Sequence, residues 1–106
     1  MSVIDEERMT AAMTFLAESD LAIAEAKTAL LRYEILCKRV RARHFLTGEG
    51  SVDARKAAAE GAGEVIEADD ALIAATLSFE ALKAKRQRAE LLIEVWRSLE
   101  ASRRKT

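Results

Sequence analysis

Proline is absent from this chain of 106 residues, and cysteine occurs only once, at Cys37. Without proline, no residue removes a backbone donor and forces a helix to end, and one cysteine cannot form a disulfide within the chain. No run of about 18 apolar residues exists, so no transmembrane helix and no membrane association is expected. The first residues, MSVIDEER, are acidic and lack the apolar stretch of a secretory signal. We therefore expect a cytoplasmic protein.

The sequence also lacks the patterns that carry chemistry. The only histidine, His44, follows Cys37 by seven residues, which is about 10 Å along a helix. One metal ion needs its ligands within about 2.3 Å, so the pair cannot share an ion within one chain, and an ion held across an oligomer axis stays an alternative. The acids between Glu64 and Asp70 come without a Glu-x-x-His motif, and Gly48-Glu49-Gly50-Ser51 lacks the lysine of a phosphate-binding loop. No enzyme activity, cofactor or metal is expected.

The composition favours long helices. Alanine fills 21 positions, half of the residues are apolar and a third are charged, which is typical of helices rather than sheets. Division into two domains would leave pieces too small to bury a core. We expect one all-α domain over 1–106.

The segment 3–46 is predicted to be a single helix. Its apolar residues recur at alternating spacings of four and three over about five heptads, as in a coiled-coil seam. This seam consists of Met9, Ala12, Leu16, Ser19, Ile23, Ala26, Leu30, Tyr33, Cys37, Val40 and His44.

A turn is predicted over 47–50, because Gly48 and Gly50 can adopt positive φ and Ser51 is placed to cap a following helix. The rest of the chain, 51–103, is interpreted as a second helix with a mild kink at 61–63, where Gly61 and Gly63 each cost about 1 kcal/mol relative to alanine. The alternative is a break there that leaves a separate short helix. A short connection makes the two long helices antiparallel neighbours, in a coiled-coil-like hairpin.

The second helix repeats the seam from Val65 to Trp96, but Arg86 interrupts it. A second apolar line runs down another side through Ile66, Ile73, Leu77 and Leu91. Because one antiparallel partner covers only one face, we expect a homo-oligomer, in the form of a four-helix-bundle dimer or a larger assembly. The predicted core of the hairpin and oligomer comprises Leu16, Ile23, Leu30, Cys37, Val65, Leu72, Phe79, Leu82, Ile93 and Trp96.

Charge alternates in blocks along the chain, although the net charge is only −1. With the turn at 48–50, residues whose numbers add up to about 97 face each other, so acidic Asp5–Glu7 meets Arg88. Trp96 to Thr106 then projects beyond the first helix. The basic and overhanging residues are candidates for contacts with a partner or with nucleic acid: Lys83, Lys85, Arg86, Arg88, Trp96, Arg97, Arg103, Arg104 and Lys105.

The residues 81–104, ALKAKRQRAELLIEVWRSLEASRR, together with Gly50-Ser51-Val52, resemble a group of small helical proteins of bacteriophages and prophages. Members share a Leu/Ile-rich segment followed by Trp-Arg, and an ending of the Ala/Asn-x-Arg-Arg kind. They are encoded near genes for DNA recombination. The resemblance implies phage DNA metabolism or host takeover in a bacterial host cell.

These observations predict a non-enzymatic helical interaction protein, an accessory factor in recombination-associated phage or prophage DNA metabolism. Two alternatives stay open. One is an inhibitor or adaptor that binds a host protein, such as a defence antagonist, and the other is a virion assembly or chaperone protein. A protein partner is expected, and DNA binding is the weaker expectation.

Overall fold

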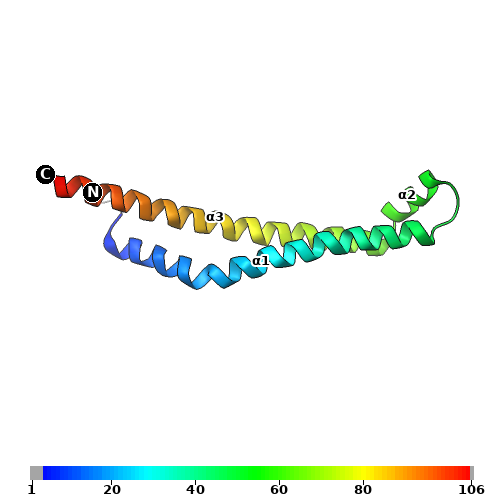
Figure 1. Ribbon diagram of the computed structural model, residues 1–106, viewed down its shortest axis with the longest axis horizontal. Helices are drawn as coiled ribbons and strands as arrows, with labels where there is room; N and C mark the ends of the chain where they lie inside the picture. The colour runs from blue at the N-terminus through cyan, green and yellow to red at the C-terminus, as the bar shows by residue number, and fades with distance from the viewer. Residues whose placement is uncertain (1–3, 106) are drawn as a thin grey trace. The chain divides into compact units, whose positions relative to one another are not determined.

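A computed structural model describes residues 4–105 (Figure 1). This part of the chain holds three helices and no strand: α1 (Glu6–Thr47), α2 (Val52–Glu60) and α3 (Gly63–Lys105). The long helices α1 and α3 run antiparallel as the arms of a helical hairpin, and α2 lies in the connection between them. The predicted all-α hairpin is confirmed.

Local hydrogen bonds accompany both ends of α1. The Asp5 carboxylate accepts a hydrogen bond from the Arg8 amide at 2.8 Å, which satisfies one of the free donors of the first turn. Glu6 and Glu7 follow in that turn, where negative charge is favourable. At the other end the Thr47 hydroxyl donates to the Arg43 carbonyl at 2.9 Å.

The turn after α1 forms at the predicted glycines. Gly50 has a φ of +95°, a conformation that only glycine adopts without strain. The Ser51 hydroxyl then accepts a hydrogen bond from the Ala54 amide at 3.1 Å and caps α2. Both the turn and its serine cap agree with the sequence.

The prediction of one kinked helix over 51–103 is wrong, because this segment forms two helices, α2 and α3. α2 ends at Glu60, where the Gly61 amide donates to the Ala57 carbonyl at 3.2 Å, and α3 starts at Gly63. Two glycines within three residues lower the helix propensity locally. In addition, α2 makes its own contacts with α1, as Ala59 is buried and Glu60 pairs with Arg41.

The chain folds into two compact units, each of which takes one stretch from α1 and one from α3. Unit 1 consists of 1–24 and 80–106, of which 4–24 and 80–105 are described. Unit 2 is 25–79 and includes α2.

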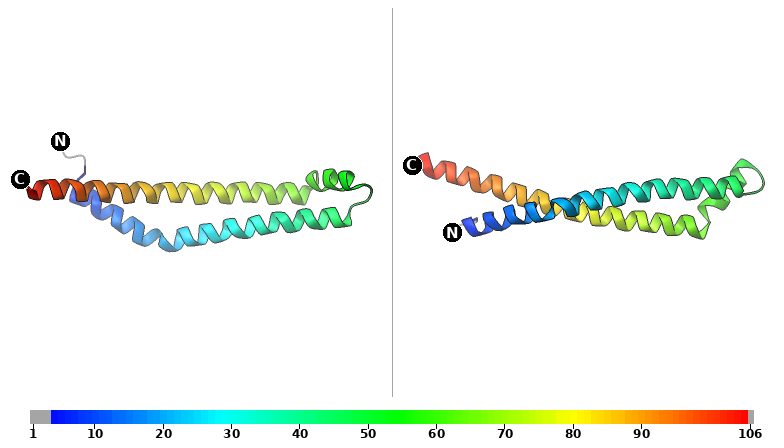
Figure 2. Two further views of the ribbon diagram at one scale, coloured as in Figure 1. Left: turned by 45° about the horizontal axis from the view of Figure 1, so that its top comes forward. Right: turned by 60° about the horizontal axis from the view of Figure 1, so that its bottom comes forward.

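Figure 2 shows the ribbons of α1 and α3 from two further directions. Each unit has a small set of buried side chains on these helices. In unit 1 the buried residues Ala12, Ala89 and Ile93 form a cluster against which larger apolar side chains pack. In unit 2 the buried apolar residues are Cys37, Val40, Ala59, Val65 and Ala68. Alanine at several of these positions lets the helices approach closely, so the core is thin.

The pairing of the two long helices differs from the one expected. Arg86 contacts Ser19 and Asp20, and Arg43 contacts Glu64, whereas the expected turn would have placed these arginines near residues 11 and 54. The shift is eight to ten positions. Its cause is the connection, because residues 48–62 include α2 and the returning helix therefore starts at Gly63 rather than Ser51.

Candidate interaction site

The predicted core residues all lie on the seam side of their helices. Cys37, Val65 and Ile93 are buried, and the remainder are half-buried: Leu16, Ile23, Leu30, Leu72, Phe79, Leu82 and Trp96. Of the first helix's seam, only Tyr33 is exposed. The heptad pattern therefore identifies the side on which α1 and α3 pack within each unit.

Arg86 occupies the seam of unit 1 and is held there by three acceptors from α1. Its guanidinium donates to the Ser19 hydroxyl at 2.6 Å, to the Leu16 carbonyl at 2.9 Å and to the Asp20 carboxylate at 2.7 Å. Its side chain is only 17% exposed. Ser19 is itself buried. Its hydroxyl donates to the Leu16 carbonyl at 3.4 Å, and the guanidinium supplies the hydrogen bond that the hydroxyl oxygen accepts.

This placement changes the candidate nucleic-acid contact. Arg86 belongs to the packing of unit 1 and offers no free guanidinium to a phosphate. The sequence contains a signal for this pairing, because Arg86 and Ser19 are polar residues in seams whose other positions are mostly apolar. Their match was missed because the expected register placed Arg86 opposite residue 11.

The other basic candidates lie on the surface of α3. Lys85, Arg88, Arg97, Arg104 and Lys105 are exposed, and within residues 4–105 none of them takes part in an ion pair. Lys83 is also exposed but has an interaction within the chain. Arg103 donates to Glu100 at 2.9 Å, one turn away on the same helix.

Trp96 does not project beyond α1, which corrects the expected overhang. It is half-buried, and it lines a hollow of about 400 Å³ together with Ile4, Asp5 and Glu6 from the start of the chain. Glu100 and Arg103 complete the lining. The shifted register brings the start of α1 alongside Trp96, so this side chain covers the end of the seam.

Unit 2 contains a second arginine network. The Arg41 guanidinium donates to Glu60 of α2 at 2.8 Å and to Asp69 of α3 at 2.6 Å, so it joins three helices. These hydrogen bonds lower the pKa of both carboxyl groups, because the charged acceptor is favoured beside a guanidinium. Arg43 and Glu64 form a further ion pair in this unit.

Cys37 is a buried thiol beside this network. Burial, and to a smaller extent a hydrogen bond and the negative charge of Asp69, raise its pKa above the ordinary value, because the apolar surroundings disfavour the thiolate. A nucleophilic cysteine needs the opposite shift. Cys37 is one of the buried residues of unit 2.

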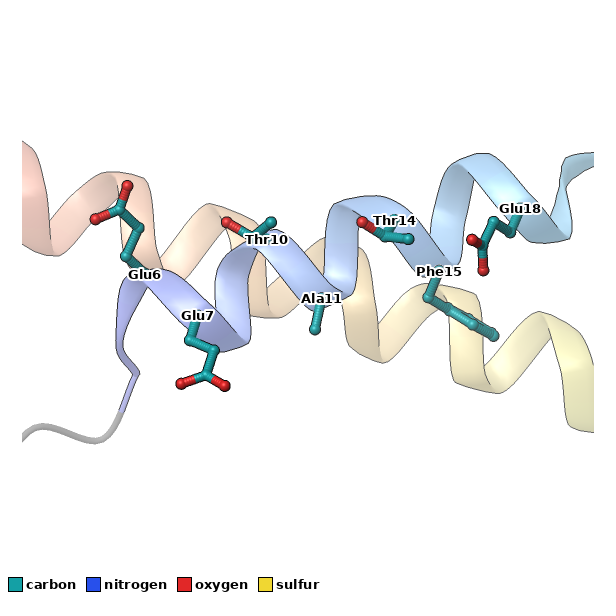
Figure 3. A pocket seen from close by; sticks show the side chains of 7 residues that line it. All are labelled: Glu6, Glu7, Thr10, Ala11, Thr14, Phe15 and Glu18. Atoms are coloured by element: carbon teal, nitrogen blue, oxygen red, sulfur yellow. The ribbon is translucent and has the colours of Figure 1, made fainter.

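One hollow lies on α1 alone. It measures about 660 Å³ and is lined by Glu6, Glu7, Thr10, Ala11, Thr14, Phe15 and Glu18 (Figure 3). All seven residues come from one helix, and Phe15 packs against the core cluster of unit 1. The hollow is a shallow acidic depression on a helix and not a cleft between elements.

Two further properties of residues 4–105 bear on function. No group of three His, Cys, Asp or Glu side chains in this range is placed to hold a metal ion. None of the three helices has the length and apolar character needed to cross a bilayer.

No protein-family model, curated protein or solved structure matches this chain.

The surface with the clearest features for binding is the outer face of α3 in unit 1, formed by Arg88, Leu91, Val95 and Leu99. At about 100° per residue, Leu91 and Val95 lie about 140° and 180° around the helix from Arg86, on the side away from the seam. All four side chains are exposed. Lys85 flanks the same side, so the outer face combines aliphatic surface with positive charge.

Proposed function

We propose that the protein is a non-enzymatic helical interaction protein, and that its outer face in unit 1 binds an acidic surface on a protein partner. The observation that carries the proposal is the exposure of three aliphatic side chains, Leu91, Val95 and Leu99, beside Lys85 and Arg88. Exposed aliphatic residues grouped on one face are typical of protein contacts rather than of nucleic-acid contacts.

We further propose that this binding serves phage or prophage DNA metabolism. The support for that context is the resemblance of residues 81–104 to small phage proteins, and these residues include the whole outer face. Arg86 is removed from the basic cluster by its contacts with Ser19 and Asp20. The remaining arrangement therefore favours contact with a protein of the DNA machinery over direct DNA binding.

The test is a pull-down with the immobilised full-length protein from phage-infected bacterial cells. The test variant carries Leu91→Asp and Val95→Asp on the outer face. The control carries Leu21→Asp, which changes an exposed aliphatic residue of α1 in the same unit. We expect a replication or recombination protein to be retained by the wild type and the control and lost with the test variant.

Other outcomes decide between the alternatives. A host defence protein captured through the same face would instead support the inhibitor or adaptor function, and a capsid or tail protein would support the assembly function. If capture does not depend on Leu91 and Val95, the outer face is not the binding surface. If the protein binds DNA directly, the affinity should be measurable at about 50 mM salt and should be much weaker at about 200 mM. Arg88→Glu should then lower the affinity for DNA.

A further inference from the structure

Few side chains attach α2 to the rest of unit 2. Of its nine residues only Ala59 is buried, Arg55 is half-buried and the others are exposed. A helix of this length is not stable on its own in water, so α2 depends on its contacts with α1. These contacts are incomplete, because a hollow of about 420 Å³ remains between the two helices. The hollow is lined by Arg41, Ala42, Phe45, Lys56, Ala59 and Glu60.

An ion pair at the surface holds the end of α2 to α1. The Arg41 guanidinium donates to the two carboxylate oxygens of Glu60 at 2.8 Å and 3.4 Å. The two side chains are 35% and 61% exposed. Exposed ion pairs contribute little to stability, and dissolved salt screens them. The attachment of α2 should therefore weaken as the ionic strength rises.

α1 and α3 have contacts with each other in unit 2 that do not involve α2. Arg41 pairs with Asp69 at 2.6 Å, and Arg43 pairs with Glu64. The buried apolar residues of unit 2 other than Ala59 also belong to α1 and α3. Movement of α2 away from α1 would thus leave most of this pairing in place.

Both ends of α2 are built to act as hinges. Gly48 and Gly50 precede the helix, and Gly61 and Gly63 follow it, in the connection between the two arms (Figure 1). Glycine has the widest choice of backbone conformations. At Gly63 an added Cβ would meet no atom within 4 Å, so neighbouring side chains do not hold the chain at this point.

We propose that α2 is a strap that opens away from α1 and closes again while α1 and α3 stay paired, and that the Arg41–Glu60 ion pair holds it closed. Segments with few buried apolar contacts open at a lower free energy than the core of a protein. Opening uncovers Ala59 and the half-buried Phe45 at the hollow. The strap therefore controls access to this hollow, and ionic strength regulates the strap.

Amide hydrogen exchange of the full-length protein, followed residue by residue by NMR, measures this opening. The amides of 55–61 report on α2, and the first and last of them, Arg55 and Gly61, donate backbone hydrogen bonds of 2.9 Å and 3.2 Å. The amides of buried Cys37 and Val40 report on α1 in the same unit. We expect protection factors over 55–61 to be at least about 100-fold lower than those of Cys37 and Val40.

Two matched variants test the ion pair. Glu60→Gln removes the charge that Arg41 holds, and it should speed exchange over 55–61 by about two- to fivefold without changing Cys37. Glu67→Gln is the control, because Glu67 is exposed on α3 and forms no ion pair within residues 4–105. This variant should leave exchange unchanged.

Salt provides a second measurement on the same amides. Raising the salt concentration from about 50 to about 500 mM should speed exchange over 55–61 in the wild type by a similar factor, because the ion pair is screened. Glu60→Gln should lack this salt dependence. Circular dichroism checks that each variant stays folded.

Three results would overturn the proposal. Equal protection over 55–61 and at Cys37 and Val40 would show that α2 opens only together with the rest of unit 2. Faster exchange throughout unit 2 in Glu60→Gln would show that opening is not confined to α2. Equal effects of Glu60→Gln and Glu67→Gln would exclude the ion pair as the closing contact. All these outcomes are independent of the proposed function, which rests on residues of unit 1.

Discussion

Arg86 shows how one residue can look like a ligand-binding group in the sequence and act as a packing group in the fold. A guanidinium in a seam is costly unless its donors are satisfied. Here Ser19, Asp20 and the Leu16 carbonyl supply the acceptors. A buried polar pair of this kind favours one alignment of two helices, because a slipped alignment leaves both groups among apolar side chains.

We expect Arg86→Leu to destabilise the protein by about 1–3 kcal/mol, because the buried Ser19 hydroxyl loses its charged donor. Combining Arg86→Leu with Ser19→Ala should recover most of that loss, since the seam then becomes apolar on both sides. Urea unfolding followed by circular dichroism measures both effects. Equal stability of the single and double variants would show that the Ser19 contact contributes nothing.

Among the elements, α2 is the one whose position depends most on polar contacts. It has nine residues and a single buried side chain, Ala59, so its own helical stability is small. The hydrogen bonds from Arg41 to Glu60 and to Asp69 attach the end of α2 and the first part of α3 to α1. The break at Gly61–Ala62 leaves α2 able to make these contacts.

This network makes the stability of unit 2 sensitive to acid. Folding lowers the pKa of Glu60 and Asp69, so their contribution is complete above their ordinary values of about 4. It is lost as the pH falls through the lowered values, because the folded state then has to take up protons. We expect the urea concentration at the unfolding midpoint of the wild type to decrease as the pH drops below about 4. Asp69→Asn should make this decrease smaller, and it should lower the midpoint at pH 7. A pH dependence identical in Asp69→Asn and the wild type would contradict this role.

At the scale of the whole molecule, the sequence predicts the class of fold, both seams and the turn after α1. These features follow from local rules, because heptad spacing and glycine placement act over a few residues. The alignment of α1 with α3 along their length could be predicted less well from the sequence. It depends on whether Gly61 and Gly63 end a helix, and that outcome depends on contacts such as Arg41 with Glu60, which are distant in sequence.

The alignment of α1 with α3 is held in each unit by an arginine on one helix and its acceptors on the other. In unit 1 these are Arg86 and its acceptors, and in unit 2 they are Arg41 with Asp69. Arg41 also holds Glu60 of the connection 48–62, and this connection sets where α3 begins. Relatives of this protein should therefore keep the length of the connection together with the two arginines and their partners.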